Sequence, residues 1–364
     1  MSDRRRVVFF AVTLAALSAI GCRADDRAGN PSGTEVTSTA SGTAGAGGGG
    51  GAATSSGAGG APDACTVDVP RIVPLEAWAE PGAGQAPFVD ALSTATTSIR
   101  VMVYEMGYGA ILDNLAAKAK AGVSVRVILD LSKQSINQKY MDQLIAAGAE
   151  VEWSDPKFTY MHAKTILIDD AIAVVSTGNY LASQMAKERN YVVRDEDPSD
   201  VASLSAIFDA DWNHVDPEVS CTRLLVSPVN ARERLLDLIS SATQTLDVES
   251  MQLADTDIRN AIASRKQAGV AVRVILADTT WIDTNADAAA FLAQNQIPAK
   301  YLVTPKVHVK AMAIDGKRAY LGSVNLSYTS LSKNREVGVI AYEPAILATM
   351  TSTFEQDWAQ ATPF

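Results

Sequence analysis

Residues 307–326 of the chain read VHVKAMAIDGKRAYLGSVNL, and residues 161–181 read MHAKTILIDDAIAVVSTGNYL. The two stretches carry the same series of polar residues at the same spacing, 146 positions apart. The chain has only 3 histidines, and this series, here called the His-Lys motif, uses two of them. Two copies with identical spacing are much harder to attribute to chance than one. The motif comprises His162, Lys164, Asp169, Thr177 and Asn179 in the first copy, and His308, Lys310, Asp315, Ser323 and Asn325 in the second.

The repeat extends beyond the motif and predicts two similar halves, residues 64–216 and 217–364. In each half, helical patterns alternate with short runs rich in β-branched residues, which predicts an α/β fold with a mixed sheet flanked by helices. A pseudo-two-fold axis between the halves would bring the two motifs together, so we expect the active site at their interface. The other matching segments are 98–106 with 245–253, 121–130 with 268–277, and 208–212 with 354–358.

Residues 1–22 resemble a bacterial export signal. Basic residues at Arg4–Arg6 precede an apolar run, Val7–Ile20, that has the length of a signal-peptide core rather than of a membrane span. Gly21 before Cys22 resembles a lipobox, at which the cysteine is lipidated. We therefore expect an exported bacterial lipoprotein, anchored at Cys22 and facing the periplasm or the cell exterior. Cleavage without lipidation is the alternative.

The next segment, residues 23–63, consists mainly of Gly, Ala, Ser and Thr and predicts a disordered linker. Cys65 and Cys221 each precede a threonine at the head of a half. In an exported protein such a pair predicts a disulfide between them, and two buried free thiols are the alternative.

The overall charge argues against extended contacts with nucleic acid. The formal net charge is −10 at pH 7, with 47% hydrophobic residues. Binding along a phosphate backbone relies on dense lysine and arginine. We therefore expect no nucleic-acid partner, although a local basic pocket is compatible with this composition.

The residue types in the motif suit chemistry on a phosphate group. Alternation along a strand places His and Lys on one face, so two facing copies would supply two imidazoles, two ammonium groups and two amides. Lysines and amides can hold a tetrahedral oxyanion. One imidazole can attack phosphorus to form a phosphohistidine, while the other protonates the leaving oxygen and activates the acceptor. No cluster of metal-ligand type is seen, so we expect no metal or other cofactor. His214, whose counterpart is Gln360, is expected to be structural.

The pattern H-x-K-x4-D-x6-G-S-x-N resembles the signature of the phospholipase D superfamily, and the second copy matches it at every position. This resemblance covers both halves and implies a two-half α/β fold with a metal-independent phosphodiesterase mechanism. It implies that His162 and His308 are the nucleophile and the general acid/base. The implied phosphate-binding residues are Lys164, Lys310, Asn179, Asn325, Ser323 and Thr177, with Asp169 and Asp315 as supporting residues.

The first copy departs from the pattern in two respects. Ser176-Thr177 replaces Gly-Ser, which adds bulk where the backbone is expected to approach closely. In addition, the position 28 residues after the histidine is Glu336 in the second half but Asn190 in the first. A carboxylate would support a charged imidazole, which favours His308 as the more basic one. The resemblance instead gives the nucleophilic role to His162, so the assignment stays open, and Glu336 as a solvated charge is a further alternative.

Export, lipid anchoring and net acidity favour a phospholipid substrate at a membrane surface. We predict a phospholipase D that hydrolyses the head group and transfers the phosphatidyl group to alcohols, with water or alcohol as acceptor. The alternatives are a nuclease-type phosphodiesterase, a cardiolipin-synthase-like phosphatidyltransferase and a non-catalytic lipid-binding protein. Residues 104–109, 130–140 and 277–287 should line the mouth of the site, where Trp281 and Ile282 could contact lipid.

Overall fold

The computed structural model describes residues 71–219 and 222–364. The predictions made for the export signal, for the lipid anchor at Cys22, for the linker 23–63 and for the Cys65–Cys221 disulfide lie outside these residues.

The N-terminal half is built on a mixed sheet with the strand order β1-β7-β6-β5-β2-β3-β4. Strands β2, β3 and β4 are parallel to one another, and the other neighbours are antiparallel. Its strands are β1 (Glu76–Glu80), β2 (Ser98–Val103), β3 (Ser124–Leu129), β4 (Glu150–Trp153), β5 (Lys164–Ile168), β6 (Ile172–Ser176) and β7 (Glu188–Asp195). Its helices are α1 (Ala86–Ser93), α2 (Ala110–Lys120), α3 (Gln134–Ala146), α4 (Ala182–Met185) and α5 (Pro198–Trp212), with a short 3-10 turn at Leu131–Lys133.

The C-terminal half repeats this topology in the order β8-β15-β14-β13-β9-β10-β11, with β16 added at the far edge. The repeat in sequence is thus a repeat in structure, as predicted. The strands are β8 (Leu224–Ser227), β9 (Thr245–Ser250), β10 (Ala271–Ala277), β11 (Ala299–Leu302), β12 (Lys306–Val307), β13 (Lys310–Ile314), β14 (Arg318–Gly322), β15 (Glu336–Ala341) and β16 (Thr362–Pro363). The helices are α6 (Ala231–Ser240), α7 (Thr256–Gln267), α8 (Asn285–Gln294), α9 (Tyr328–Ser332) and α10 (Pro344–Gln360).

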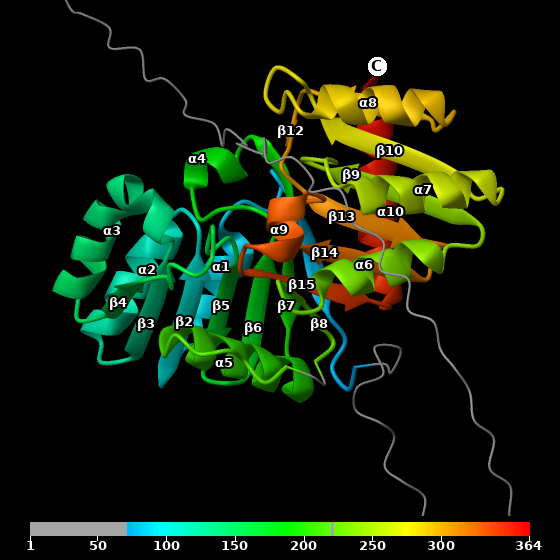
Figure 1. The fold of residues 1–364 in the computed structure, drawn as a ribbon. Helices are drawn as coiled ribbons and strands as arrows, with labels where there is room; N and C mark the ends of the chain where they lie inside the picture. The colour runs from blue at the N-terminus through cyan, green and yellow to red at the C-terminus, as the bar shows by residue number, and fades with distance from the viewer. Residues whose placement is uncertain (1–70, 220–221) are drawn as a thin grey trace, which may run out of the picture.

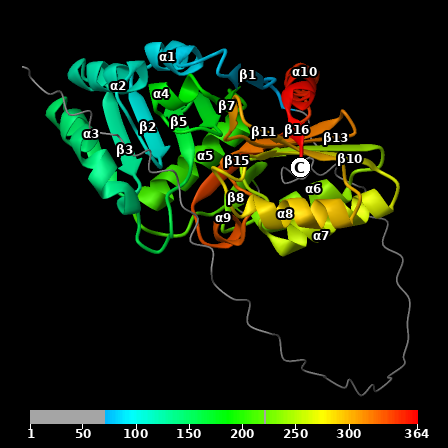
Figure 2. The same ribbon diagram turned by 90° about the horizontal axis from the view of Figure 1, so that it is seen from above.

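The two halves lie side by side, with α2 and α3 on the outer flank of one and α6, α7 and α8 on the outer flank of the other (Figures 1 and 2). Because the central strands are covered on both faces, their sequences are almost continuously apolar. One buried cluster lies under the outer helices of each half. A third cluster lies between the halves and includes α5 and α10.

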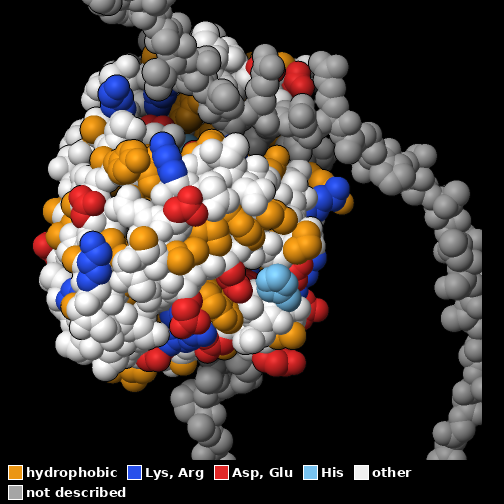
Figure 3. All heavy atoms as spheres, turned by 90° about the vertical axis from the view of Figure 1, so that its left-hand side faces the viewer, with side chains coloured by type: hydrophobic (Ala, Val, Ile, Leu, Met, Phe, Trp, Pro, Cys, Tyr) orange, Lys and Arg blue, Asp and Glu red, His pale blue; other side chains and the backbone are white. Residues whose placement is uncertain are grey.

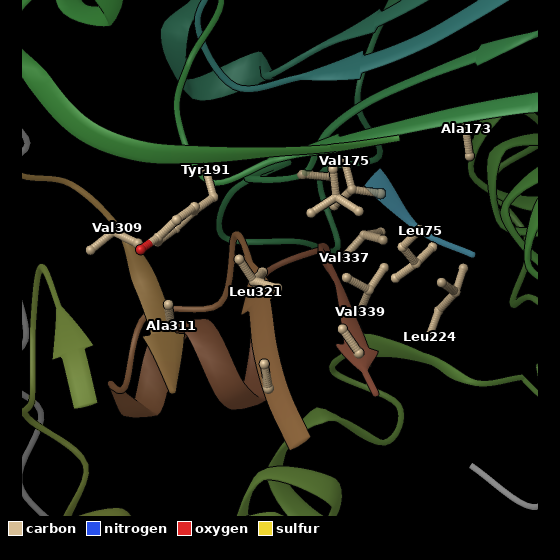
Figure 4. Close-up of a cluster of buried hydrophobic side chains, with 14 of the residues drawn as sticks. Leu75, Ala173, Val175, Tyr191, Leu224, Val309, Ala311, Leu321, Val337 and Val339 are labelled. Carbon is tan, nitrogen blue, oxygen red and sulfur yellow. The ribbon is translucent and has the colours of Figure 1, made fainter. Parts of the chain in front are cut away.

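This third cluster is the interface that builds the site. Alternate residues of a strand point to one face, so β15 directs Val337 and Val339 toward the first half while β6 directs Ala173 and Val175 toward the second (Figure 4). Tyr191 of β7 reaches the same layer. Burial of each such valine or larger side chain contributes about 1.5–3 kcal/mol. The halves are therefore held together by an ordinary hydrophobic core.

Backbone pairing also crosses between the halves, immediately before each motif histidine. Met161 bridges to Arg335, and β12 pairs with the start of β7, where Val307 lies opposite Arg189. The two arginines repeat the crossing with their side chains. Arg335 binds the buried Asp211 of α5, and Arg189 binds Asp357 of α10. Each half thus holds the other by the same set of contacts.

Across the described ranges 71–219 and 222–364, no helix is both long and apolar enough to cross a membrane.

Candidate active site

The crossing segments bring the two motif histidines to the interface. The backbone N–H of His162 donates to the carbonyl of Arg335 at 2.9 Å, and that of His308 donates to the carbonyl of Arg189 at 3.2 Å. Both side chains are buried, with 6% and 3% of their surface exposed. Lys310 of the second motif donates to the carbonyl of Thr177 in the first motif at 3.3 Å, so the two motifs are in direct contact. The predicted meeting of the two motifs is therefore present in the structure.

The imidazole of His162 is held by a carboxylate from the other half. Its Nδ1 lies 2.8 Å and 3.0 Å from the two oxygens of Glu336. Burial alone would raise the pKa of this carboxyl, but His162, Lys164 and Asn334 hold it below its ordinary value, so Glu336 is ionised. The Glu336 carboxylate also accepts from the Ser330 hydroxyl at 2.8 Å and from the Asn334 amide at 3.0 Å.

The imidazole of His308 is held by an amide instead. Its Nδ1 donates to Oδ1 of Asn190 at 3.0 Å, and the same oxygen accepts from the Thr177 hydroxyl at 2.8 Å. Burial and the charges of Lys310 and Lys164 hold the pKa of His308 well below 6.5. For His162, burial lowers the pKa and Glu336 raises it, and the net value is about 4.

These contacts correct the expectation that Glu336 supports His308. Glu336 follows His308 by 28 residues in the chain, yet it contacts His162, because β15 begins beside residue 161 of the other half. In the same way, Asn190 follows His162 in the chain but contacts His308 of the other half. The alternative of Glu336 as a solvated charge is also wrong, since the residue is fully buried.

The two motif lysines fold back toward the histidine two residues earlier. Lys164 and Lys310 are fully buried. Lys164 donates from Nζ to the carbonyl of His162. Lys310 donates to the carbonyl of His308 at 2.6 Å and to the carbonyl of Thr177, in the other half, at 3.3 Å. Two ammonium groups therefore lie next to the two imidazoles.

Each motif asparagine has a side-chain oxygen without a hydrogen-bond partner among the described residues. These atoms, Oδ1 of Asn179 and Oδ1 of Asn325, are buried. An amide carries an acceptor and two donors on nearly the same shape, so either group can bind a phosphate oxygen after rotation. A matched pair of unused amide atoms fits the predicted role.

The hydroxyls of Thr177 and Ser323 are instead engaged with the protein. Thr177 accepts from the backbone N–H of Tyr191 at 3.0 Å, and Ser323 donates to the carbonyl of Val337 at 3.2 Å. In this structure they shape the strands that carry the site rather than presenting free donors.

The departure at Ser176 has a structural explanation. In the second half, the Tyr320 hydroxyl accepts from the N–H of Val324 at 3.0 Å, and the ring crosses two glycines to reach it. In the first half, the Ser176 hydroxyl accepts from the N–H of Gly178 at 3.0 Å and donates to its carbonyl at 3.1 Å. Ser176 thus replaces the distant tyrosine hydroxyl with its own, so the added bulk is accommodated.

The motif aspartates lie at the far end of the strands from the histidines. Asp169 and Asp315 follow β5 and β13 with φ of 51° and 54° and accept hydrogen bonds from the segments before β2 and β9. Five residues of strand place them roughly 16 Å from the motif lysines. They fasten the sheets and do not reach the phosphate site.

Two aromatic rings flank the histidines. Tyr104 meets the His162 ring edge-on at 4.8 Å between centroids, and Trp281 stacks on His308 at 6.0 Å and 27°. Both come from segments expected to line the mouth. Ile282 is buried in the core between the halves, so the expectation that it contacts lipid is wrong. Trp281 itself is half-buried against the same core. The sequence of a loop carries no signal that separates an apolar side chain in the core from one at the surface.

The loops around the site are fastened by two buried asparagines that sequence reasoning missed. Asn137 donates to the carbonyl of Tyr104 at 2.9 Å, and Asn285 donates to the carbonyls of Met251 and Ala277 at 2.9 Å. Each is completely buried. In the sequence, each of these asparagines looks like an ordinary exposed polar residue of a helix. Only the packing of the structure shows that it is buried.

His214 lies at the surface after α5, with φ of 54°, away from the other two histidines. Over residues 71–219 and 222–364, there is no group of three or more histidine, cysteine or acidic side chains placed to hold a metal ion.

Comparison with known proteins connects this geometry to one family. A sequence model of the family described as "Cardiolipin synthase, PLD-like domain" matches residues 88–212 and 235–358. The cardiolipin synthase of Clostridium perfringens is 23% identical over 292 residues, which is 68% of this chain and 61% of that protein. The cardiolipin synthase of Halalkalibacterium halodurans is 24% identical over 317 residues, 73% of this chain and 62% of that protein.

Among solved structures, the phosphatidylserine synthase of Haemophilus influenzae is similar with a TM-score of 0.65, at 14% identity, over 82% of this chain and 90% of that one. That likeness concerns the fold. The chain spans less than two thirds of the length of the two cardiolipin synthases. The family model nevertheless matches each half, with one His-Lys motif in each match. The chain therefore belongs to the phospholipase D superfamily and carries its PLD-like domain twice.

Proposed function

We propose that this protein is a cardiolipin-synthase-like phosphatidyltransferase. The observation that carries this proposal is the single buried site in which each imidazole is oriented by a residue of the opposite half, His162 by Glu336 and His308 by Asn190. The similar cardiolipin synthases support transfer as the main reaction. Hydrolysis of the head group, which the sequence alone favours, becomes the side reaction.

In the first step, Nε2 of His162 attacks phosphorus while the bond to the leaving alcohol breaks. Nδ1 of His162 carries its proton toward Glu336, so the lone pair on Nε2 is free and the positive charge of the phosphohistidine is compensated. His308, in its protonated form, gives its proton to the departing oxygen. The incoming phosphodiester carries one negative charge, which favours protonation of His308.

In the second step, neutral His308 takes the proton of the acceptor hydroxyl as its oxygen attacks phosphorus. The bond from phosphorus to Nε2 of His162 breaks, and both imidazoles return to their starting states. Lys164, Lys310 and the amides of Asn179 and Asn325 hold the phosphoryl oxygens through both steps.

The acceptor is an alcohol group on a second lipid. Cardiolipin contains two phosphatidyl groups on one glycerol, so its formation by transfer requires a lipid hydroxyl as the acceptor. The histidines are buried, and the Tyr104 and Trp281 rings cover one side of each imidazole with aromatic surface. Exclusion of water from such a site favours a lipid hydroxyl over hydrolysis.

Extended binding of nucleic acid is not expected. On the face that carries the outer flank of the N-terminal half, acidic and basic side chains are interspersed (Figure 3). The formal net charge of the chain is −10. Phosphate-backbone binding requires a continuous basic surface, which this visible face does not present.

The test is a product assay with phosphatidylglycerol vesicles. We expect cardiolipin and free glycerol as the main products and phosphatidic acid as a minor one. His162→Ala and His308→Ala should each reduce both products by at least about 10³-fold. Phosphatidic acid as the main product would instead establish a hydrolase. Cleavage of single-stranded DNA with no lipid product would overturn the lipid substrate altogether.

A further inference from the structure

The strand that supports each histidine carries one acid and one amide, in opposite order in the two halves. The series is Asn334-Arg335-Glu336 where the chain enters β15 at Glu336, and Glu188-Arg189-Asn190 at the start of β7. Residues two apart on a strand share a face. Each supporting segment therefore carries the same two residue types, an acid and an amide, in exchanged positions, and the amide of Asn334 contacts Glu336 at 3.0 Å.

In the second-half strand, the carboxylate touches the imidazole and the amide stands behind it. In the first-half strand, Asn190 touches His308 and the carboxylate of Glu188 stands behind, with Oε2 at 3.7 Å from Nδ1 of His308. Glu188 is only 6% exposed, and this oxygen has no hydrogen-bond partner among residues 71–219 and 222–364. The Glu188 oxygen nearest to His308 therefore faces the imidazole without a hydrogen bond to another described residue.

A second buried carboxyl, Glu80, lies beside this pair. Glu80 is opposite Asn190 in the register of β1 with β7 and is completely buried. The equivalent position in the other half is Ser227, opposite Glu336. Burial and the neighbouring Glu188 raise the pKa of Glu80 to about 8, so this carboxyl is protonated at pH 7. With Glu80 neutral, the acidic group nearest to each histidine is Glu336 for His162, at 2.8 Å, and Glu188 for His308, at 3.7 Å.

We propose that Glu188 is a positioning residue for His308, which stabilises the protonated imidazole through space while Asn190 fixes the tautomer. The proposal rests on the proposed function and deepens it, since it explains how a histidine without a direct carboxylate can act as the general acid. The acid of this strand, Glu188, lies two residues before the residue that contacts the imidazole. His308 is therefore a weaker base than His162, which suits His308 as the general acid and His162 as the nucleophile.

The other charged groups around Glu188 set the size of the effect. Burial, with a smaller effect of the nearby Glu105, raises the pKa of Glu188 above its ordinary value, while Lys310, the Asn190 amide and Lys306 oppose this rise and favour the ionised form. A structural reading is that Glu188 only balances Lys310. That reading predicts lower stability after its removal but no change specific to His308.

The kinetic test compares three variants. Glu188→Gln should lower kcat by about 10–100-fold, within the range for general acid catalysis, with KM changed less than about threefold. Loss of the carboxylate lowers the pKa of His308, so the fall of activity at high pH should begin at lower pH. The double variant Glu188→Asn with Asn190→Glu reproduces the Asn-Arg-Glu series that leads into β15. Its kcat should be at least about tenfold higher than that of Glu188→Gln. Glu76→Gln, an exposed acid on β1 with Glu80, is the matched control.

The second test does not depend on any substrate. The chain has only 3 histidines, so their ring signals can be assigned by NMR with His308→Ala and His162→Ala. We expect Glu188→Gln to shift the titration of His308 to lower pH and to leave those of His162 and the exposed His214 unchanged. Equal shifts for all three rings, or no shift for His308, would overturn the proposal. A failure of phosphatidyl transfer with the expected NMR shift would count against the proposed function only.

Discussion

Nδ1 of His162 lies 2.8 Å from a carboxylate oxygen of Glu336, a residue 174 positions later that belongs to the other half of the molecule. The contact is buried on both sides. A histidine and its orienting carboxylate thus come from two different copies of the repeat. Neither half carries a complete site by itself, because each imidazole depends on the opposite strand for its orientation.

Replacing Glu336 by Gln should reduce kcat by about 10²–10⁴-fold. Glu336 raises the pKa of His162, so its loss lowers that pKa further and withdraws support from the charged phosphohistidine. Steady-state transfer rates measure the effect. Glu233→Gln, an exposed acid on α6, is the control and should change kcat less than about twofold. A Glu336→Gln enzyme of normal kcat would contradict the assigned role.

The covalent intermediate should form on His162. With His308→Ala the first step lacks its proton donor, but a substrate with a good leaving group such as a nitrophenyl phosphodiester does not need one. We expect mass spectrometry of this variant to find the phosphoryl adduct on a peptide that contains His162. The reciprocal His162→Ala variant should form none. An adduct on His308 in that variant would reverse the two roles.

Gly322→Ala should destabilise the second half by about 1–3 kcal/mol, the usual cost of overpacking. A Cβ at Gly322 would lie 2.4 Å from Cα of Gly338 and 2.9 Å from the Tyr320 hydroxyl. Chemical denaturation measures the change in the free energy of unfolding. Gly82→Ala is the control, since its Cβ would meet nothing closer than 3.7 Å. Equal stability of both variants would show that the two strands can separate freely.

Arg335→Met should cost about 3–5 kcal/mol, because it leaves Asp211 buried without its partner. Arg335 binds this aspartate through Nε at 2.8 Å and through Nη2 at 2.9 Å, and 1% of each side chain is exposed. The free energy of unfolding is the measurement. The control is Asp216→Ala, which removes an exposed ion pair with Lys157 and should cost less than about 1 kcal/mol. A smaller loss of stability than in the control would mean that the Arg335–Asp211 ion pair does not stabilise the contact between the halves.

Asp315→Asn should lower stability at neutral pH by about 1 kcal/mol, after allowance for its partial exposure. Burial alone would raise the pKa of Asp315, but the Thr243 hydroxyl and three backbone N–H groups hold it to about 2. A carboxyl with a lowered pKa contributes stability above about pH 4, and this is lost as the pH falls toward about 2. The difference from the native chain should therefore vanish in acid. Asp237→Asn, exposed on α6, is the control, and an unchanged kcat in both variants is expected.

Much of the fold could be predicted from the sequence because the relevant signals are local and occur twice. Period-two alternation and β-branched runs mark the strands, and the repeat shows that both halves share one topology. The spacing of His162 and Lys164, and of His308 and Lys310, keeps each pair together. In the structure the lysine begins a strand and the histidine lies two residues before it. The phosphate-binding role of Asn179 and Asn325 stays a prediction, and the buried Oδ1 of each has no hydrogen-bond partner among the described residues.

What the sequence alone determined, then, is that two copies of one motif meet at one site. Only the tertiary structure decided which half completes which histidine, because spacing along a chain is the same whether a strand supports its own half or the other. The crossing arises from how two twisted sheets pack around an apolar layer, and that packing pairs His162 with Glu336 and His308 with Asn190. The role proposed for Glu188 likewise depends on the tertiary structure, because no sequence pattern encodes the distance of 3.7 Å between its Oε2 and Nδ1 of His308.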